Sequence, residues 1–172
     1  MKYLIFAIFI LVFVPTVNAA QRLNAHCPPS FDKTAANKCE LVSLYDLYDS
    51  PTGHGGFRVE LPKLKPQYTP QQMDLGRILF FDPVLSKNQD LSCASCHQLE
   101  KGLADGRARS ISAVDKNGNR GELNRGTPSL WNIAFHQRFM WDGRAPSLQE
   151  QAKLPLFAAK EMGNTSENLE AT

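Results

Sequence analysis

Two cysteines separated by two residues, with a histidine directly after the second, constrain this chain more than any other feature of its sequence. The run is Cys93-Ala94-Ser95-Cys96-His97. Two side chains three positions apart lie on one face of a single helical turn, and the imidazole follows at once. This spacing is typical of a c-type haem attachment site. We therefore expect one haem c, bound covalently by Cys93 and Cys96, with His97 on the iron.

Two other kinds of site also use paired cysteines. A zinc site needs a second pair of ligands with suitable spacing, and Cys27 with Cys39 does not supply it. A redox-active dithiol needs a βαβ setting, and the sequence shows none. The haem interpretation is therefore favoured over both.

The first 19 residues have the pattern of a secretory signal peptide. Lys2 supplies the positive charge, residues 3–14 are apolar without a break, and Val17-Asn18-Ala19 offers small residues at a cleavage site. The apolar run is shorter than the roughly 20 residues that span a bilayer. We expect cleavage after Ala19, a periplasmic location, and no membrane contact of the mature protein.

Cys27 and Cys39 lie outside the haem run and twelve positions apart. In an exported protein such a pair favours a disulfide over two unpaired thiols. The bond would staple an N-terminal segment of residues 20–68. Within it, residues 40–49 predict one short helix, and the Gly- and Pro-rich residues 50–67 predict an irregular surface stretch.

A helix signal opens the domain of residues 69–172. Thr69 can cap a helix, Pro70 suits its first position, and Gln72 completes a capping box. The helix should end at Asp82-Pro83. Its buried stripe should consist of Leu75, Ile78 and Leu79.

Shorter helices and long loops are expected after it. Residues 91–100 should form a short helix with the haem cysteines, residues 101–125 a long polar loop, and residues 127–133 a helical turn. Ser147 opens a second capping box, and Pro155 should stop that helix. No strand pattern of useful length is present. The expected fold class is mainly α: a cytochrome c-like haem domain with long loops and a disulfide-stapled N-terminal segment.

The charge balance bears on possible partners. The chain has 19 Lys and Arg against 17 Asp and Glu, a net charge of +2, and no run of five like charges. Neither nucleic acid nor an anionic membrane surface is therefore expected as a partner.

The far side of the iron decides between an electron carrier and a catalyst. A tightly bound sixth ligand closes the metal, whereas an open position admits peroxide. Met140 lies among aromatic residues, which favours a packing role. His136 is explained as structural or surface, and His54, between two glycines, as a solvated loop residue. Met162 adjoins Glu161, so either of these two side chains could face the iron.

A series of short runs between residues 69 and 164 carries a family resemblance. The runs are Leu75-Gly76-Arg77, Leu79-Phe80-Phe81-Asp82-Pro83, Leu91-Ser92-Cys93-Ala94-Ser95-Cys96-His97, Asp105-Gly106, Thr127-Pro128-Ser129, Phe139-Met140-Trp141-Asp142-Gly143-Arg144 and Glu161-Met162-Gly163. In this order they resemble the bacterial di-haem cytochrome c peroxidase family, which includes the MauG proteins.

The resemblance implies an exported enzyme with two cytochrome c-like haem domains, in which the N-terminal haem reacts with hydrogen peroxide and the C-terminal haem passes electrons to it. It implies that His97 is the proximal ligand of the peroxidatic haem, Glu161 the distal acid–base and Trp141 the relay between haems. Asp142 and Arg144 are expected to form a local pair that fixes their turn. The implied partners are hydrogen peroxide and either a small redox protein that donates electrons or a protein that is oxidised.

Three departures from the family pattern stand out. Only one Cys-x-x-Cys-His run is present, so either the chain is a fragment or a partner supplies the second haem domain. No histidine lies between His97 and Trp131, so the distal histidine of members that need reductive activation is missing and the haem is expected to stay open. Gly126 stands where many relatives have the asparagine that binds an interdomain calcium, which makes calcium doubtful here.

Two alternatives remain open at the level of the sequence. The chain could be a mono-haem electron-transfer cytochrome c with Met162 or Met140 as the axial ligand. It could also be an inactive remnant whose haem site does not mature.

Overall fold

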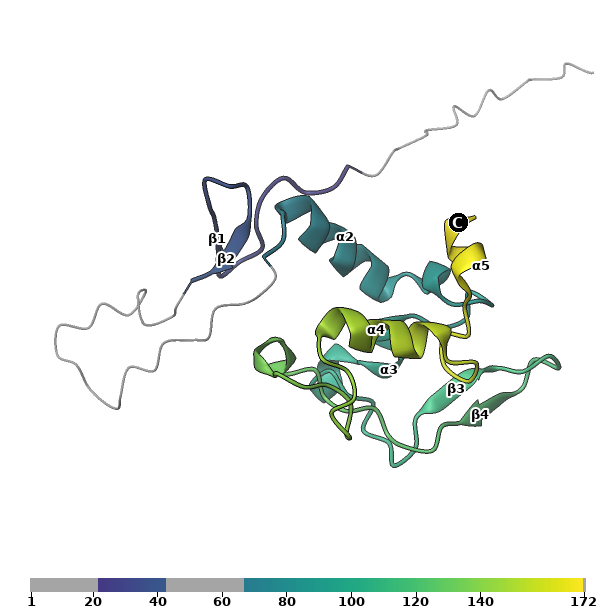
Figure 1. Ribbon diagram of the computed structural model, residues 1–172. Helices are drawn as coiled ribbons and strands as arrows, with labels where there is room; N and C mark the ends of the chain where they lie inside the picture. The colour runs from purple at the N-terminus through teal and green to yellow at the C-terminus, as the bar shows by residue number, and fades with distance from the viewer. Residues whose placement is uncertain (1–21, 43–66, 172) are drawn as a thin grey trace, which may run out of the picture.

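The computed structural model describes residues 22–42 and 67–171 (Figure 1). The elements in chain order are β1 (Phe31–Lys33), β2 (Cys39–Leu41), α2 (Pro70–Phe81), η1 (Pro83–Leu85), α3 (Cys93–Cys96), η2 (Leu99–Lys101), β3 (Ile111–Val114), β4 (Arg120–Glu122), η3 (Ile133–Phe135), α4 (Leu148–Phe157) and α5 (Ser166–Glu170), where η marks a 3₁₀ turn. The predicted signal peptide and His54 lie outside the described residues.

The N-terminal segment is a small hairpin closed by the expected Cys27–Cys39 disulfide, which the structure confirms. Strands β1 and β2 pair antiparallel. The N–H of Cys39 donates to the Tyr68 carbonyl at 2.8 Å, which joins the hairpin to the start of α2. Figure 1 shows the hairpin beside that end of the helix.

The helix expected over residues 40–49 is wrong at its start. Glu40 and Leu41 belong to β2, where they pair with Asp32 and Phe31. Cross-strand pairing and the adjacent disulfide hold this stretch extended, whatever its helical periodicity. The rest of that predicted helix lies outside the described residues.

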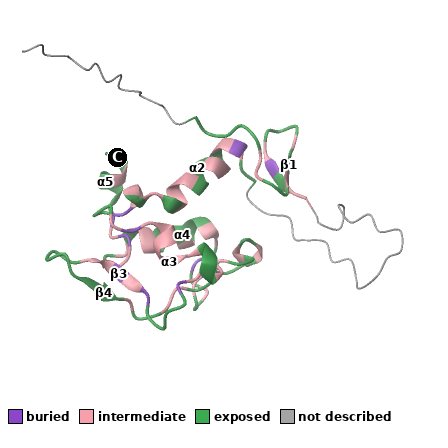
Figure 2. Ribbon diagram, turned by 180° about the vertical axis from the view of Figure 1, so that it is seen from behind, coloured by how far each residue is buried: buried purple, intermediate pink, exposed green. Residues whose placement is uncertain are grey.

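Helix α2 confirms the capping prediction. Thr69 Oγ1 accepts from the Gln72 N–H at 3.2 Å, and Gln72 Oε1 accepts from the Thr69 N–H at 3.0 Å. The helix ends before Asp82, as expected. The predicted buried stripe is wrong, because Leu75 is 43% exposed and Ile78 and Leu79 are only half-buried. The main contacts of α2 with other elements are those with α3 and η1, and Figure 2 shows both exposed and half-buried residues along the helix.

The expected loop of residues 101–125 contains a second hairpin. Ile111 pairs with Glu122 and Val114 with Arg120, with an irregularity between them. Side-chain hydrogen bonds help to hold the pair, since Ser112 Oγ accepts from the Gly121 N–H at 3.0 Å. With two hairpins among the described residues, the fold is mixed and partly helical rather than mainly α.

Two shorter helical predictions also need correction. Helix α3 covers Cys93–Cys96 and not residues 91–100, because the N–H of Gln98 turns away to the Ala104 carbonyl at 3.0 Å. The helical turn over residues 127–133 is absent, and η3 begins only after Asn132, which has a left-handed backbone (φ 57°).

Helix α4 begins where predicted, with Ser147 Oγ accepting from the Glu150 N–H at 3.2 Å. It does not stop at Pro155 but ends at Phe157. Proline removes one N–H donor. Hydrogen bonds to the last turn hold the helix beyond the proline: the carbonyls of Leu154, Pro155 and Leu156 accept from the N–H groups of Ala158, Met162 and Asn164, all at 3.0 Å.

Few apolar side chains are fully buried in the described residues, and Figure 2 shows the buried positions scattered among several elements. The buried apolar side chains are Cys39, Pro70, Leu91, Phe139, Ala145 and Met162. Across residues 22–42 and 67–171, no helix has the length and apolar character that crossing a membrane requires.

Candidate functional site

Helix α3 presents the two predicted haem cysteines, Cys93 and Cys96, from one turn. The N–H of Ser92 donates to Ser95 Oγ at 2.9 Å, and the N–H of His97 donates to the Cys93 carbonyl at 2.8 Å. Both Cys93 and Cys96 are free and half-buried. Burial raises the pKa of the Cys93 thiol. The turn therefore offers two free cysteines three positions apart.

His97 is oriented by a backbone contact. Its Nδ1 lies 2.9 Å from the Leu103 carbonyl oxygen. Because a carbonyl oxygen only accepts, Nδ1 carries the proton and donates it. The other ring nitrogen, Nε2, then keeps its lone pair for a metal ion. Together with the two free thiols, this donor set fits a covalently attached haem with His97 on the iron.

The Leu103 carbonyl is placed by an unusual loop. Gly102 and Leu103 both have positive φ, at 64° and 58°. The N–H of Leu103 donates to the Gln98 carbonyl at 2.8 Å, and Gln98 pairs with Ala104. This narrow loop turns the chain back so that a carbonyl faces the imidazole.

Behind Cys96 lies a buried polar group centred on Ser110. Ser110 is 1% exposed; its Oγ accepts from Thr127 Oγ1 at 2.8 Å and donates to Cys96 Sγ at 3.5 Å. Asp105, also buried, accepts from the N–H groups of Arg107 and Thr127 through Oδ1. These contacts join the strand β3 side of the domain to Cys96, the second of the predicted haem cysteines.

Asp105 is ionised within this buried group. Burial raises its pKa, but its polar neighbours, Ser110 first and then the N–H groups of Arg107 and Thr127, outweigh burial and hold the pKa below its usual range. Within the described residues, its Oδ2 atom is buried without a hydrogen-bond partner.

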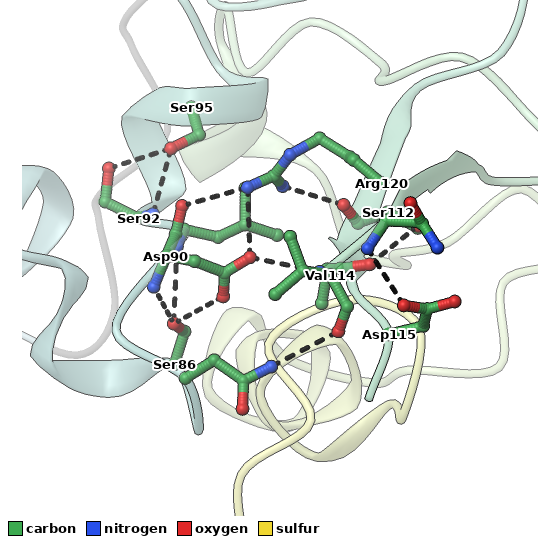
Figure 3. A network of polar contacts seen from close by, with 12 residues as sticks. Ser86, Asp90, Ser92, Ser95, Ser112, Val114, Asp115 and Arg120 are labelled. Carbon is green, nitrogen blue, oxygen red and sulfur yellow. Dashed lines mark hydrogen bonds and ion pairs between the residues drawn. The ribbon is translucent and has the colours of Figure 1, made fainter. Parts of the chain in front are cut away.

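A polar network connects the segment before α3 to the β3–β4 hairpin (Figure 3). Asp90 Oδ2 accepts from the Val114 N–H at 3.1 Å and pairs with Arg120 at 3.0 Å. Ser86 Oγ accepts from the Asp90 N–H at 3.0 Å. Arg120 also donates to the Ser112 carbonyl at 2.7 Å. The segment that leads into the Cys93–Cys96 turn is thereby braced from the hairpin side.

Glu161 lies in the turn that follows α4, and it is half-buried. The carbonyls on either side of it are bound by distant segments: that of Lys160 accepts from the Ala113 N–H and that of Met162 from the Lys87 N–H, both at 2.9 Å. Burial raises the pKa of Glu161, while the positive charge of Arg144 acts against that rise. A carboxyl with a raised pKa is suited to both accept and donate a proton near neutral pH.

Trp141 lies at the tip of a tight turn and is 72% exposed. The turn is closed by paired hydrogen bonds between Phe139 and Ala145 and by the Gly143 N–H, which donates to the Met140 carbonyl at 3.1 Å. The guanidinium of Arg125 lies 4.4 Å from the centroid of the indole ring.

The neighbours of Trp141 behave as predicted. Asp142 and Arg144 form an ion pair of 2.8 Å across the same turn, so the expected local pair is confirmed. The Arg144 side chain lowers the pKa of Asp142 through this contact.

The sequence model of the family described as di-haem cytochrome c peroxidase matches residues 70–172. The chain belongs to this family. It is similar to the methylamine utilization protein MauG of Methylorubrum extorquens, with 43% identity over 127 residues, 74% of this chain and 33% of the relative. It is also similar to the cytochrome c551 peroxidase of Pseudomonas aeruginosa, with 40% identity over 59% of this chain and 28% of the relative.

Among solved structures, the chain is similar to a MauG-like protein associated with microbial copper homeostasis, with a TM-score of 0.52 and 32% identity over 72% of this chain and 34% of the other. The chain thus spans about a third or less of the curated relatives named above. The resemblance predicted from the sequence runs is confirmed at the level of the family.

Within the family domain, the structure brings some predicted residues together and leaves others apart. Cys93, Cys96 and His97 share one turn. Within the described residues, no hydrogen bond or ion pair joins Glu161 or Trp141 to that turn. The assignments of all five residues remain predictions.

The methionines and His136 are placed as follows. Met162 is 9% exposed, beside Glu161 in the chain. Met140 is half-buried, with its Sδ 3.8 Å from Gln151 Nε2, and His136 is exposed at the end of η3. Because Cys27 and Cys39 form a disulfide, they are not available as the second ligand pair of a zinc site.

Sequence reasoning missed Leu103, Ser110, Asp105 and Arg125. The Asp105-Gly106 run carries part of the family resemblance, and this signal could have pointed to Asp105. The other three are common residue types whose partners become visible only in the fold.

Position 126 bears on the calcium prediction. An ideal Cβ on Gly126 would overlap the Arg107 carbonyl oxygen. An asparagine would therefore need a shift of the backbone here. The expectation against calcium at this position stays a prediction.

Proposed function

We propose that this chain is the peroxidatic domain of a periplasmic c-type haem peroxidase, which reduces hydrogen peroxide or uses it to oxidise a partner protein. Membership in the family supports a peroxidase-type function. Within the proposal, residues 1–19 are a cleaved signal peptide, residues 20–68 a stapled N-terminal segment and residues 69–172 a cytochrome c-like domain.

One haem c would be held by this chain. Cys93 and Cys96 would form its thioether bonds, and His97 would hold its iron through Nε2. The hydrogen bond from His97 Nδ1 to the Leu103 carbonyl supports this assignment, since it fixes the tautomer that a metal requires.

When bound, the haem supplies an iron at which the O–O bond of hydrogen peroxide is reduced. The contribution of Glu161 is proton transfer: its carboxylate takes a proton from one peroxide oxygen and returns it to the other, which leaves as water. The observation that carries this role is the half-buried carboxyl, whose pKa is raised by burial and whose neighbours on both sides are held by main-chain hydrogen bonds.

Electrons would reach the site from outside this chain. A small redox protein would donate them, or a partner protein would lose them, and Trp141 would pass them on. The exposed position of its indole supports this role, because the ring is accessible to another haem domain or to a partner.

The test is the variant Glu161→Gln in the haem-loaded chain. Removing the acid–base group should slow the single-turnover reaction with hydrogen peroxide by roughly 100-fold or more, measured by stopped-flow absorbance. Glu150→Gln is the matched control, since Glu150 is an exposed carboxylate on α4 paired only with Lys153. Peroxide kinetics that match the wild type in Glu161→Gln would remove Glu161 from the mechanism.

The ferric spectrum separates the peroxidase from the electron-transfer alternative. A high-spin spectrum with rapid cyanide binding is expected for the open site. A low-spin spectrum with a methionine–iron band would instead support a mono-haem cytochrome c with Met162 or Met140 as ligand. A mature protein without covalent porphyrin would overturn both.

A further inference from the structure

The contact between Arg125 and Trp141 is not explained by charge pairing. The guanidinium lies 4.4 Å from the indole centroid. Within the described residues Arg125 has no carboxylate partner, and Asp142, next to the indole, is engaged by Arg144. The positive charge of Arg125 therefore acts on the ring without a neutralising anion in contact.

Both partners are held by their own segments of backbone. The Arg125 carbonyl accepts from the Ser110 N–H at 2.9 Å, and Gly126 lies directly against the Arg107 carbonyl. Trp141 is fixed by the closed turn between residues 139 and 145. The main chain of both residues is therefore anchored by the fold, and from these two anchored segments the guanidinium lies over the ring.

A cation over an aromatic face is attracted by the electrons of the ring. When the ring loses an electron it becomes positive, and the attraction turns into repulsion. The guanidinium cannot relieve this repulsion by losing a proton, because its pKa is too high. One-electron oxidation of such an indole is therefore less favourable than that of a free one.

We propose that Arg125 is a positioning residue that makes Trp141 harder to oxidise than an equally exposed tryptophan. The resistance of Trp141 to oxidation follows from the Arg125–Trp141 contact alone. The part that this resistance plays in peroxide reduction rests on the proposed function. Reduction of hydrogen peroxide to two waters consumes two protons and two electrons. These two electrons pass one at a time. In each step the Trp141 indole gives one electron to the site that peroxide has oxidised and regains one electron from an external donor, so the indole ends unchanged. Arg125 shortens the time for which the indole lacks an electron and is open to attack by oxygen or water.

Trp131 provides an internal reference in the same chain. It is 68% exposed against 72% for Trp141, and no cation lies over its ring within the described residues. The haem-loaded chain is treated with hexachloroiridate(IV), a one-electron oxidant, and the oxidised tryptophan peptides are quantified by mass spectrometry. Trp141 should be modified roughly two- to five-fold more slowly than Trp131.

The charge of the oxidant separates two explanations. Hexachloroiridate(IV) is an anion, so simple attraction by Arg125 would speed modification of Trp141. If the charge of Arg125 instead makes the indole harder to oxidise, modification of Trp141 is slower. Faster modification of Trp141 than of Trp131 in the wild type would therefore overturn the proposal.

Two variants separate charge from bulk. Arg125→Met keeps a side chain of similar length without charge and should bring the Trp141 rate up to that of Trp131. Arg125→Lys keeps the charge and should retain part of the protection. Full protection in Arg125→Met would show that the side chain only covers the ring, and the proposal would fail. Both rates are read in one molecule, and near-ultraviolet circular dichroism checks that each variant is folded.

A second arm uses hydrogen peroxide in place of hexachloroiridate(IV). The proposed function expects peroxide to modify Trp141 in Arg125→Met more than in the wild type. If peroxide leaves Trp141 unmodified while hexachloroiridate(IV) shows the protection, the relay role of Trp141 fails and the effect of Arg125 stands.

Discussion

At the scale of single residues, left-handed backbone positions place several of the candidate groups. Leu103 has a positive φ although it is not glycine, and its carbonyl accepts the hydrogen bond from the Nδ1–H of His97. Met140 has φ 67° directly before Trp141. Such positions cost on the order of 1–3 kcal/mol each and persist only where the surroundings hold them. Two of the six non-glycine residues with positive φ in the described part of the chain thus orient the predicted haem histidine and the exposed indole.

The charge of Arg144 gives a prediction for the pH dependence of the peroxide reaction. Burial raises the pKa of Glu161 and Arg144 opposes that rise. The carboxyl must be ionised to accept a proton, so the rate falls as the pH drops through this pKa. In Arg144→Gln the opposing charge is gone, the pKa rises further, and the acid limb of the rate profile should move to higher pH.

Stopped-flow rates between about pH 4 and pH 8 would measure that shift. Arg77→Gln is the control, because Arg77 pairs with Asp74 on the surface of α2. If the acid limb stays in place in Arg144→Gln, the charge of Arg144 does not influence the pKa of Glu161. If the limb moves to lower pH, Arg144 raises that pKa, which contradicts the prediction.

The sequence predicts those site residues whose chemistry depends on local spacing. Cys93, Cys96 and His97 are three neighbours in one turn, and the Asp142–Arg144 pair spans two positions. Ser110 was not predictable in this way, since its partner Cys96 lies fourteen positions away and serine is a common residue. Contacts of this kind follow from the fold and not from local pattern.

At the scale of elements, capping signals were the most reliable guide. Thr69 and Ser147 both cap the helices expected of them, because a cap depends only on neighbouring backbone groups. The β3–β4 hairpin went unpredicted, since β4 reads Arg120-Gly121-Glu122 and has no apolar alternation. Its register is held by side chains such as Ser112 and Arg120, which bond across the pair and to Asp90.

Loss of the first cap gives a prediction at this scale. Thr69→Ala removes the hydrogen bond that Thr69 Oγ1 accepts from the Gln72 N–H, and it should lower the free energy of unfolding by about 1 kcal/mol, measured by urea denaturation. Thr165→Ala is the matched control on the shorter helix α5, where Thr165 Oγ1 accepts from the Asn168 N–H. An effect of Thr69→Ala no larger than that of the control would contradict a role of this cap in the stability of the domain.

At the scale of the whole molecule, the stapled hairpin is tied to the family domain. The N–H of Asn24 donates to Asp74 Oδ2 at 2.8 Å, and the Cys39–Tyr68 bridge adds a main-chain contact. Asp74 receives these bonds from Asn24 and Arg77, which lower its pKa. The hairpin should therefore unfold together with the domain.

Removal of the disulfide tests this coupling. The double variant Cys27→Ser, Cys39→Ser releases a constraint across twelve positions and should lower the free energy of unfolding by about 3 kcal/mol. Urea denaturation followed by tryptophan fluorescence reports on the family domain, since Trp131 and Trp141 both lie in it. A fluorescence transition at the wild-type midpoint would show that the hairpin is a separate unit.

The two main-chain hydrogen bonds beside Glu161 bear on how far this region can diverge in sequence. The carbonyls of Lys160 and Met162 accept from the N–H groups of Ala113 and Lys87. Main-chain groups are the same whichever side chain a residue carries. These two bonds therefore set no requirement on the side chains at positions 87, 113 and 160, except that a proline at position 87 or 113 would have no N–H to donate; Met162 differs, because its side chain is buried.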